Sequence, residues 1–322
     1  MRIILAIFAI MLVCNANDVK AYGSNPVLTN MIYLLNPKSL VGFNYEPYEE
    51  DLEFMDKSIH NLPIIGGFMN GAETNLEGLI KLKPQVIFTS GSGGIEGFED
   101  KIKQFGIRAV NLKVGNLSEM LDSLLVMGKE LDREQKALDL KRWIENNLKA
   151  LDNPPQNRPT IYFAQGVDGL QSVCGDDSEN DLAKTIGGKN IIKCSGDIKQ
   201  RININAEQLL GNEPDIIFVR EVAMFKELRE NPKGFWSSLK AVKNGKVFYA
   251  PSSPSNWLMR PPSLMLGIGL PWAFSVVENA DRFASGGIPL EEGNKRAIEE
   301  FYALFLDYSL SEDDLRKLFK VD

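Results

Sequence analysis

Two arginines stand where a charged ligand could be held. Arg220 directly follows the apolar run 216–219, which predicts a buried strand and places the guanidinium at its carboxyl end. Arg260 lies in a proline-rich segment. Because a guanidinium presents a planar fork of donors, it suits carboxylate or catecholate oxygens. The alternatives are an ion pair with Glu221 for Arg220, and a role in fixing its own loop for Arg260.

The sequence offers little for direct metal capture or catalysis. His60 is the only histidine, whereas a site for a bare zinc or manganese ion uses several histidines with an acid. The glycine-rich segment 91–97 has Glu96 where a dinucleotide-binding motif needs its third glycine, and no Gly-x-Ser-x-Gly elbow occurs. We therefore expect neither an enzyme nor a resident metal or cofactor, with an α/β enzyme as a remote alternative.

The composition is that of an ordinary globular chain. Of the 322 residues, 44% are hydrophobic and 25% are charged, so the length suits two lobes or one large α/β unit. The 36 basic and 43 acidic residues give a formal net charge of -7. This balance argues against a nucleic acid or an anionic membrane held by bulk charge.

The start of the chain has the pattern of a secretory signal. The apolar run 3–13 is well short of the roughly 20 residues that span a bilayer, and small residues follow it. We expect residues 1–16 to be removed and the protein to be exported to the periplasm. The alternatives are a cut that releases Tyr22, lipid attachment at Cys14, and a buried first strand or helix.

Export affects how the cysteines are interpreted. With the signal removed, Cys174 and Cys194 remain as a pair in an oxidising compartment. A bridge between them would close a loop of about 20 residues and stabilise the fold by roughly 3 kcal/mol. Two separate buried thiols are the alternative.

Two segments of the chain share one pattern without a gap. Residues 75–88 and 205–218 both match Asn-x-Glu-x-Leu-aliphatic-x-x-x-Pro-x-aliphatic-Ile-Phe. Each predicts an Asn-capped helix with a glutamate in its first turn, a stop at proline, and a buried parallel strand. Two copies predict two similar lobes, unless two common helix-to-strand units match by chance.

The elements around these repeats predict an α/β fold in both halves. Residues 118–153 have apolar side chains at helical spacing and predict one long helix that joins the lobes. Strands alternate with helices on both sides of it, so we expect parallel-sheet lobes at 17–117 and 154–322. Ligands of such sheets bind beyond the carboxyl ends of the strands, here in a cleft between the lobes.

Duplicated lobes with one connecting helix resemble a known family. They are similar to the periplasmic substrate-binding proteins, of the helical-backbone metal receptor type, that deliver ferric siderophores, haem and vitamin B12 to ABC importers. Further matching segments are Tyr-Gly-Ser-Asn-Pro at 22–26, Ile-Gly-Gly at 65–67, Ile-Gly-Gly-Lys-Asn-Ile at 186–191 and Asn-Trp-Leu-Met-Arg-Pro-Pro-Ser at 256–263. The resemblance implies a monomer whose Glu77 and Glu207, at matching places in the lobes, dock into an ABC permease dimer. The simpler alternative is that each glutamate only complements its helix dipole.

The loops after the predicted strands supply the side chains expected to contact the ligand. These are Ser24, Asn25, Tyr45, Ser90, Gln165, Arg220, Ser252, Trp257 and Arg260. Aromatic walls with scattered polar groups suit a bulky metal chelate: a ferric siderophore, haem, a corrinoid or a nickel complex. A molybdate or tungstate oxyanion, cradled by the neutral donors and one arginine, is the alternative.

Overall fold

The N-terminal half of the chain builds a parallel sheet. A computed structural model describes residues 18–67, 75–91, 98–151, 157–174, 181–193 and 202–321. In it β1 (Ala21–Gly23), β2 (Val86–Ser90) and β3 (Arg108–Leu112) pair in that order, all parallel. Parallel bridges from Ala21 to Leu40 and from Phe43 to Ile64 extend the sheet beyond β1.

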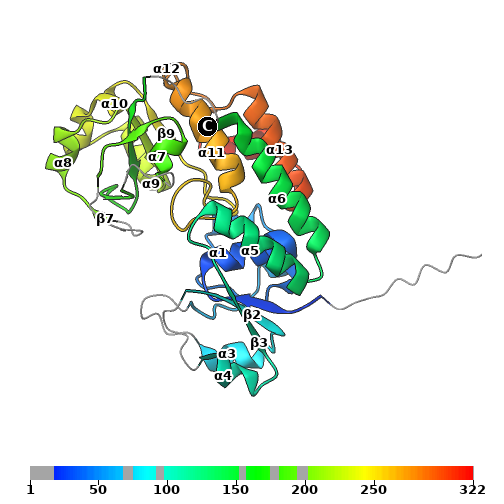
Figure 1. Ribbon diagram of the computed structural model, residues 1–322. Helices are drawn as coiled ribbons and strands as arrows, with labels where there is room; N and C mark the ends of the chain where they lie inside the picture. The colour runs from blue at the N-terminus through cyan, green and yellow to red at the C-terminus, as the bar shows by residue number, and fades with distance from the viewer. Residues whose placement is uncertain are drawn as a thin grey trace, which may run out of the picture.

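The C-terminal half builds a second parallel sheet on the same plan. Its strands are β4 (Thr160–Ala164), β6 (Lys189–Asn190), β8 (Ile216–Val219) and β9 (Val247–Tyr249), in the order β6-β4-β8-β9. A short antiparallel pair, β5 (Gln171–Ser172) with β7 (Ile202–Asn203), lies beside it. The prediction of two α/β lobes with parallel sheets is confirmed, and Figure 1 shows the lobes at opposite ends of the molecule.

The duplicated sequence forms the same unit in both lobes. Helix α3 (Leu76–Lys81) leads into β2, and helix α8 (Ala206–Gly211) leads into β8. The Asn75 side chain accepts from the Gly78 amide, and the Asn205 side chain accepts from the Gln208 amide. Both predicted N-caps therefore satisfy amides of the first helical turn.

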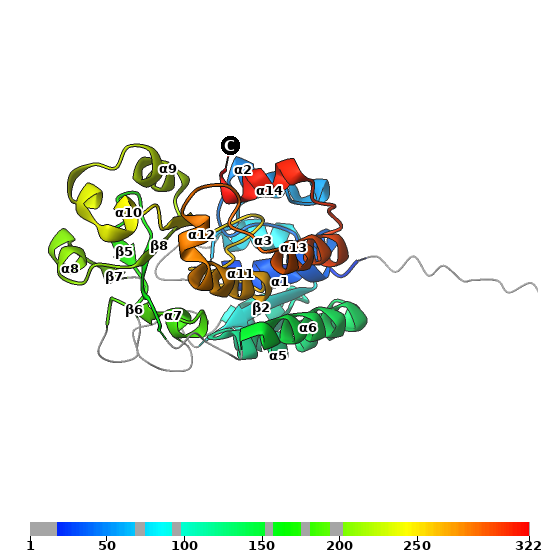
Figure 2. The ribbon, with the colours of Figure 1, turned by 90° about the horizontal axis from the view of Figure 1, so that it is seen from above.

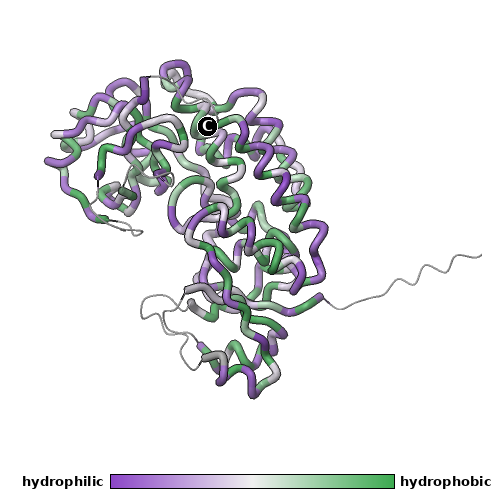
Figure 3. The backbone as a smooth tube through the Cα atoms, viewed as in Figure 1, coloured by the Kyte–Doolittle hydropathy of each residue, from purple (hydrophilic) through white to green (hydrophobic). Residues whose placement is uncertain are grey.

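Helices cover both sheets and form a shared layer between them. They are α1 (Pro26–Leu35), α2 (Glu49–Leu52), α4 (Phe98–Lys103), α5 (Leu117–Glu130), α6 (Glu134–Leu148), α7 (Leu182–Thr185), α9 (Val222–Glu230), α10 (Lys240–Lys243), α11 (Leu266–Glu278), α12 (Ala280–Phe283), α13 (Glu292–Phe305) and α14 (Glu312–Phe319), with short 3-10 turns η1 (Pro37–Ser39), η2 (Lys57–Ile59), η3 (Lys149–Leu151) and η4 (Gly234–Ser238). Along α6 and α13 hydrophobic and hydrophilic residues alternate, as expected of helices with one buried face (Figure 3).

One hydrophobic core runs through both lobes. Alternate strand residues point to opposite faces, so Val86 and Phe88 of β2, with Ile216 and Phe218 of β8, contribute to a common core. The opposite faces pack separately, with Ile87 in an N-lobe cluster and Ile217 in a C-lobe cluster. The two sheets are thus held through a shared apolar layer rather than by a single connecting segment.

The predicted helix over 118–153 is wrong as a single element. The structure has two helices, α5 and α6, which pack against each other and are separated at residues 131–133. Asp132 adopts a left-handed φ of 55°, and the Arg133 amide donates to the Gly128 carbonyl at 2.7 Å. This left-handed residue ends α5 and reverses the chain, a turn that glycine or asparagine more often makes.

The N-terminal residues that the structure describes are bound into the fold. Asp18 pairs with Arg133 at 2.7 Å and accepts from the Asn36 amide at 2.8 Å. The Lys20 amide donates to the Gln85 side chain at 2.9 Å, and β1 begins at Ala21. A cut that released Tyr22 would remove these contacts, whereas the predicted cut before Asn17 would keep them. The residues predicted to be the signal, 1–16, lie outside the described residues.

Within the described ranges, no helix is both long enough and apolar enough to cross a membrane.

Candidate functional site

The carboxyl end of β8 places a charged pair at the lobe boundary. Arg220 Nη1 donates to Glu221 Oε1 at 3.1 Å, and Arg220 Nε donates to Asn256 Oδ1 at 3.2 Å. Both charged side chains are largely buried. The ion pair between Arg220 and Glu221 is therefore present. Among the residues that the structure describes, these are the two side-chain bonds of Arg220, so its Nη2 can donate to a further partner.

The N-terminal lobe faces this pair with aromatic and acidic side chains. Tyr45 and Tyr48 are 49% and 63% exposed, and Asp51 follows them at α2. The Asp51 carboxylate accepts from the Ser253 hydroxyl at 2.6 Å, across 202 positions of the chain. The charge of Arg220 acts on both Tyr45 and Asp51. Side chains of the two lobes thus meet at this point.

Burial changes the ionisation of the groups at this contact. It raises the pKa of Asp51 to about 6, although the Ser253 hydrogen bond acts in the opposite direction. Burial also raises the pKa of Tyr249 to about 12, and the Tyr249 and Ser252 hydroxyls lie 3.1 Å apart. The site therefore holds a neutral phenol and a carboxyl group that becomes ionised as pH rises through about 6.

A pocket opens between α1, the 43–47 loop and the 254–255 segment. We call it the acid–aromatic pocket; its lining residues are Pro26, Thr29, Asn30, Tyr33, Phe43, Asn44, Tyr45, Pro47, Asp51, Met55, Pro254 and Ser255. Its cavity is about 40 Å³. Asp51 is the only charged side chain in this lining, so the pocket is acidic when that carboxyl is ionised.

The segment around α2 also contacts the C-terminal helix. Glu50 pairs with Lys320 and Glu53 pairs with Lys317, and Figure 2 shows α2 beside α14. The ammonium of Lys320 lies 5.9 Å from the centre of the Tyr249 ring. These contacts hold the α2 segment of the first lobe against the C-terminal residues, close to Tyr249.

Some of the side chains predicted to line the cleft have structural partners instead. Asn25 caps α1 through the amides of Val27 and Leu28, and its own amide donates to Ser90 at 2.8 Å. Ser24 and Asn25 are both buried, whereas Ser90 is half-buried. Only Ser90 of these three retains surface for a ligand.

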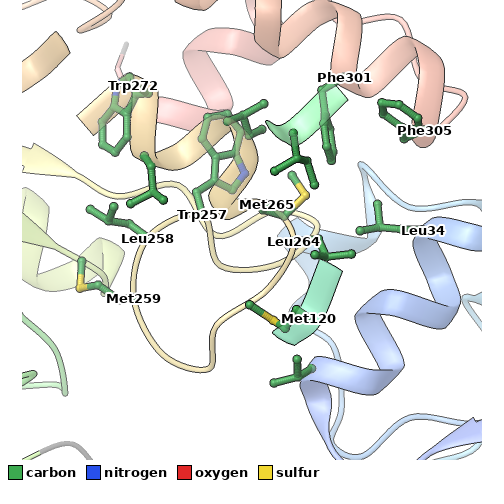
Figure 4. Packing of buried hydrophobic residues seen from close by; sticks show 14 of the residues in the cluster. Leu34, Met120, Trp257, Leu258, Met259, Leu264, Met265, Trp272, Phe301 and Phe305 are labelled. Carbon is green, nitrogen blue, oxygen red and sulfur yellow. The ribbon is translucent and has the colours of Figure 1, made fainter. Parts of the chain in front are cut away.

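The prediction that Trp257 lines the cleft is wrong. Its side chain is 0% exposed, its indole donates to the Ser253 carbonyl, and its ring packs against Trp272, Tyr302 and Phe319. Figure 4 shows Trp257 among core residues next to Met265. The tryptophan belongs to the shared core, because the loop that carries it packs against α11 at Gly269.

Gln165 also differs from its predicted position on the cleft surface. It is 0% exposed, and neither atom of its side-chain amide has a hydrogen-bond partner within the described residues. It follows β4 beside Arg220, whose amide donates to the Ala164 carbonyl. An unpaired buried amide is rare and marks a place where an additional polar group would be favourable. By contrast, Ser252 and Arg260 are half-buried, as a contact residue can be.

Sequence reasoning missed the polar partners that bring the lobes together. Asp51, Tyr249 and Asn256 were not among the predicted site residues, and each contacts or electrostatically influences one that was. The one available signal was the acidic run Glu49-Glu50-Asp51 directly after Tyr48. Nothing in that run reveals that Ser253 lies opposite.

Comparison with known proteins agrees with this architecture. A protein-family model with the description periplasmic binding protein matches residues 49–254. The chain belongs to this family. The high-affinity heme uptake system protein IsdE of Staphylococcus aureus is 28% identical over 203 residues, which cover 58% of this chain and 66% of IsdE. A vitamin B12-binding protein of Vibrio vulnificus is 28% identical over 201 residues, 60% of this chain and 70% of that protein.

A solved structure matches the whole fold. The ABC transporter solute binding protein from Sulfurospirillum deleyianum has a TM-score of 0.79 and 27% identity, and the match covers 95% of each chain. The matched region spans about two thirds of the length of the two curated relatives. The two-lobe binding fold of the family is therefore that of this chain.

The two glutamates predicted to dock onto the permease lie away from the lobe contact, on α3 and α8 (Figure 1). Glu77 and Glu207 are exposed in the first turns of α3 and α8. Cys174 is disulfide-bonded; Cys194 lies outside the described residues, so the pairing of these two cysteines stays a prediction. In the part of the chain that the structure describes, no three His, Cys, Asp or Glu side chains converge to hold a metal ion.

Proposed function

We propose that this protein is the substrate-binding component of an ABC importer, and that it captures a metal chelate between its lobes. The candidate cargoes are a ferric siderophore, haem, a corrinoid or a nickel complex. The observation that supports this most directly is the hydrogen bond at 2.6 Å between Ser253 of one lobe and Asp51 of the other, at a place where the charge of Arg220 acts on Asp51 and Tyr45. Family membership and the names of the haem and vitamin B12 relatives support the same class of cargo.

The exposed groups at the site favour an organic chelate over a small oxyanion. Tyr45 and Tyr48 present open aromatic surface, and Val167, in the loop after β4, is 93% exposed. Of the neutral donors that would cradle an oxyanion, Asn25 is buried and already engaged, because its side chain caps α1 and donates to Ser90. The Nη2 donor of Arg220 is suited to a carboxylate or catecholate oxygen of the chelate.

Titration calorimetry with a fixed panel tests the cargo class. The panel consists of a ferric catecholate, a ferric hydroxamate, haem, cobalamin, a nickel chelate and molybdate. We expect one chelate to bind most tightly, and Arg220→Gln to weaken it at least tenfold, about 1.4 kcal/mol. We expect Arg260→Ala to cost about 2 kcal/mol if that side chain meets a charged ligand group. Arg296→Gln, at an exposed arginine of α13, is the matched control. Tightest binding of molybdate would refute the proposal.

We also propose that Glu77 and Glu207 dock this protein onto the permease dimer in the periplasm. Each lies exposed at the same position of the duplicated unit, so the pair presents similar charges from both lobes. Charges of this kind mainly set the register and rate of association. The double variant Glu77→Gln with Glu207→Gln should bind the chelate normally and fail in uptake. Normal uptake by that variant would exclude the docking role.

A further inference from the structure

The acid–aromatic pocket has the chemistry of a cation subsite. Three of its donors are already used within the protein: the Asn30 amide donates to Ser255 at 2.9 Å, the Thr29 hydroxyl to Asn44 at 2.7 Å, and the Asn44 amide to the Gly23 carbonyl at 2.8 Å. The hydroxyls of the lining can donate or accept, so the Asp51 carboxylate is the group that distinguishes a charged guest from a neutral one. A guest that donates hydrogen bonds and carries a positive charge matches this lining.

The carboxylate of the pocket has no cation of its own. Asp51 accepts one hydrogen bond, from Ser253, and among the described side chains it makes no ion pair. The charges of Arg220 and Lys320 act on Asp51 without an ion pair to it, because Arg220 pairs with Glu221 and Lys320 pairs with Glu50. A half-buried carboxylate without a counter-ion is unfavourable, and the raised pKa of Asp51 agrees with that.

The walls and size of the pocket also suit a small organic cation. The rings of Tyr33, Phe43 and Tyr45 belong to the lining, and aromatic faces attract ammonium groups. The cavity of about 40 Å³ exceeds the roughly 10–15 Å³ that one water molecule needs. A primary ammonium at the end of an alkyl chain can enter such a cavity while the rest of the molecule stays in the cleft.

We propose that the acid–aromatic pocket binds an ammonium group of the cargo, with Asp51 as its counter-ion. This inference rests on the proposed function, and it narrows the cargo to a chelate that carries a primary amine. The chelate places its anionic oxygens at Arg220 and its ammonium at Asp51. The two lobes therefore bind groups of opposite charge on one molecule. The specificity lies in this pairing of charges, because a neutral chelate leaves the Asp51 carboxylate without a partner.

A small probe tests the pocket independently of any chelate. Saturation-transfer NMR titrations at pH 7.5 compare n-propylammonium with 1-propanol, which has a similar size and no charge. We expect wild type to bind the ammonium at least tenfold more tightly than the alcohol, and Asp51→Asn to abolish that preference. Glu53→Gln, which changes an acid of the same segment outside the pocket lining, should keep it. An equal preference in wild type and Asp51→Asn, or no preference in wild type, would overturn the inference.

A pair of chelates separates this inference from the proposed function. Calorimetry compares a ferric trihydroxamate that has a free primary amine with its N-acetylated form. At least tenfold weaker binding of the acetylated form supports the inference. Equally tight binding of both forms would overturn the inference and leave the proposed function standing. If wild type binds neither chelate and no other member of the panel, the proposed function fails, while the n-propylammonium titration still decides the chemistry of the pocket.

Discussion

The duplicated units α3–β2 and α8–β8 agree at their buried positions and differ at their exposed ones. Leu79 and Leu209 are both fully buried, each against the outer face of its own sheet. At the last position of the helix, however, one unit has Lys81 and the other has Gly211. Glu77 pairs with Lys81 at 2.7 Å, whereas the second helix offers Glu207 no cation at that position.

The same contrast continues at the strand ends. Strand β2 ends in the uncharged Thr89 and Ser90, whereas β8 leads into the charged pair Arg220 and Glu221. The charge of the first lobe at the cleft comes instead from Asp51, in a segment without a duplicate. The comparison teaches that packing requires the same residue types at the buried positions of both lobes. The exposed positions of the helices and the residues after the strands do not have this requirement, so they can differ in ligand-binding and docking chemistry.

The largest effect should come from the core that the lobes share. Trp257→Ala removes a fully buried ring and should lower the free energy of unfolding by about 3–5 kcal/mol. Because both sheets pack on this core, hydrogen exchange followed by mass spectrometry should speed up in β2 and β8 together. Val167→Ala, at an exposed side chain, should change stability by less than about 0.5 kcal/mol. Faster exchange in β8 alone would mean that the lobes are stabilised independently.

The duplicated leucines test the equivalence of the outer faces. Leu79→Ala and Leu209→Ala should each cost about 2–5 kcal/mol in urea unfolding, because each leaves a cavity in its own cluster. The loss of exchange protection should stay within the lobe that carries the substitution. A small cost for one variant and a large cost for the other would show that the units are alike only in sequence.

Asp51 should make the contact between lobes depend on pH. Its pKa is about 6 in the fold and near 3.8 in the unfolded chain, so its contribution to stability is fully present below pH 3.8 and is lost as pH rises through 6. Asp51→Asn should therefore gain stability relative to wild type between pH 4.5 and 7.5, by on the order of 1 kcal/mol after allowance for solvent screening. Thermal unfolding over that range measures it, with Asp313→Asn on α14 as control. A stability difference between Asp51→Asn and wild type that does not vary with pH would show that Asp51 is not part of the buried contact.

The smallest effect should distinguish the two exposed glutamates. Glu77→Gln removes both the favourable dipole interaction and the ion pair with Lys81, whereas Glu207→Gln removes only the former. Glu77→Gln should therefore lower the free energy of unfolding by about 0.3–0.5 kcal/mol more than Glu207→Gln, which is the usual contribution of such an ion pair within a helix. A double-mutant cycle with Lys81→Gln isolates the pair. A larger cost for Glu207→Gln would indicate that it has a partner of its own.

The buried pattern was predictable from sequence, and the chain reversals were not. The repeats gave both Asn caps, both helices and the strands β2 and β8, because capping and apolar runs are local properties. The turn at Asp132 was missed, since residues 129–153 contain neither glycine nor proline. Trp257 was wrongly placed in the cleft because the local sequence, an aromatic residue in a proline-rich loop, is the same whether the loop packs on a core or lines a cleft. Asp51 meets Ser253 only through the tertiary fold, which no local pattern encodes.

Native mass spectrometry combined with elemental analysis, on protein purified from the cells that produce it, tests the central claim most directly. The account predicts one added mass per chain that contains both a metal and an organic chelator carrying a primary amine. An added mass equal to a bare oxyanion, or an organic molecule without metal, would contradict it.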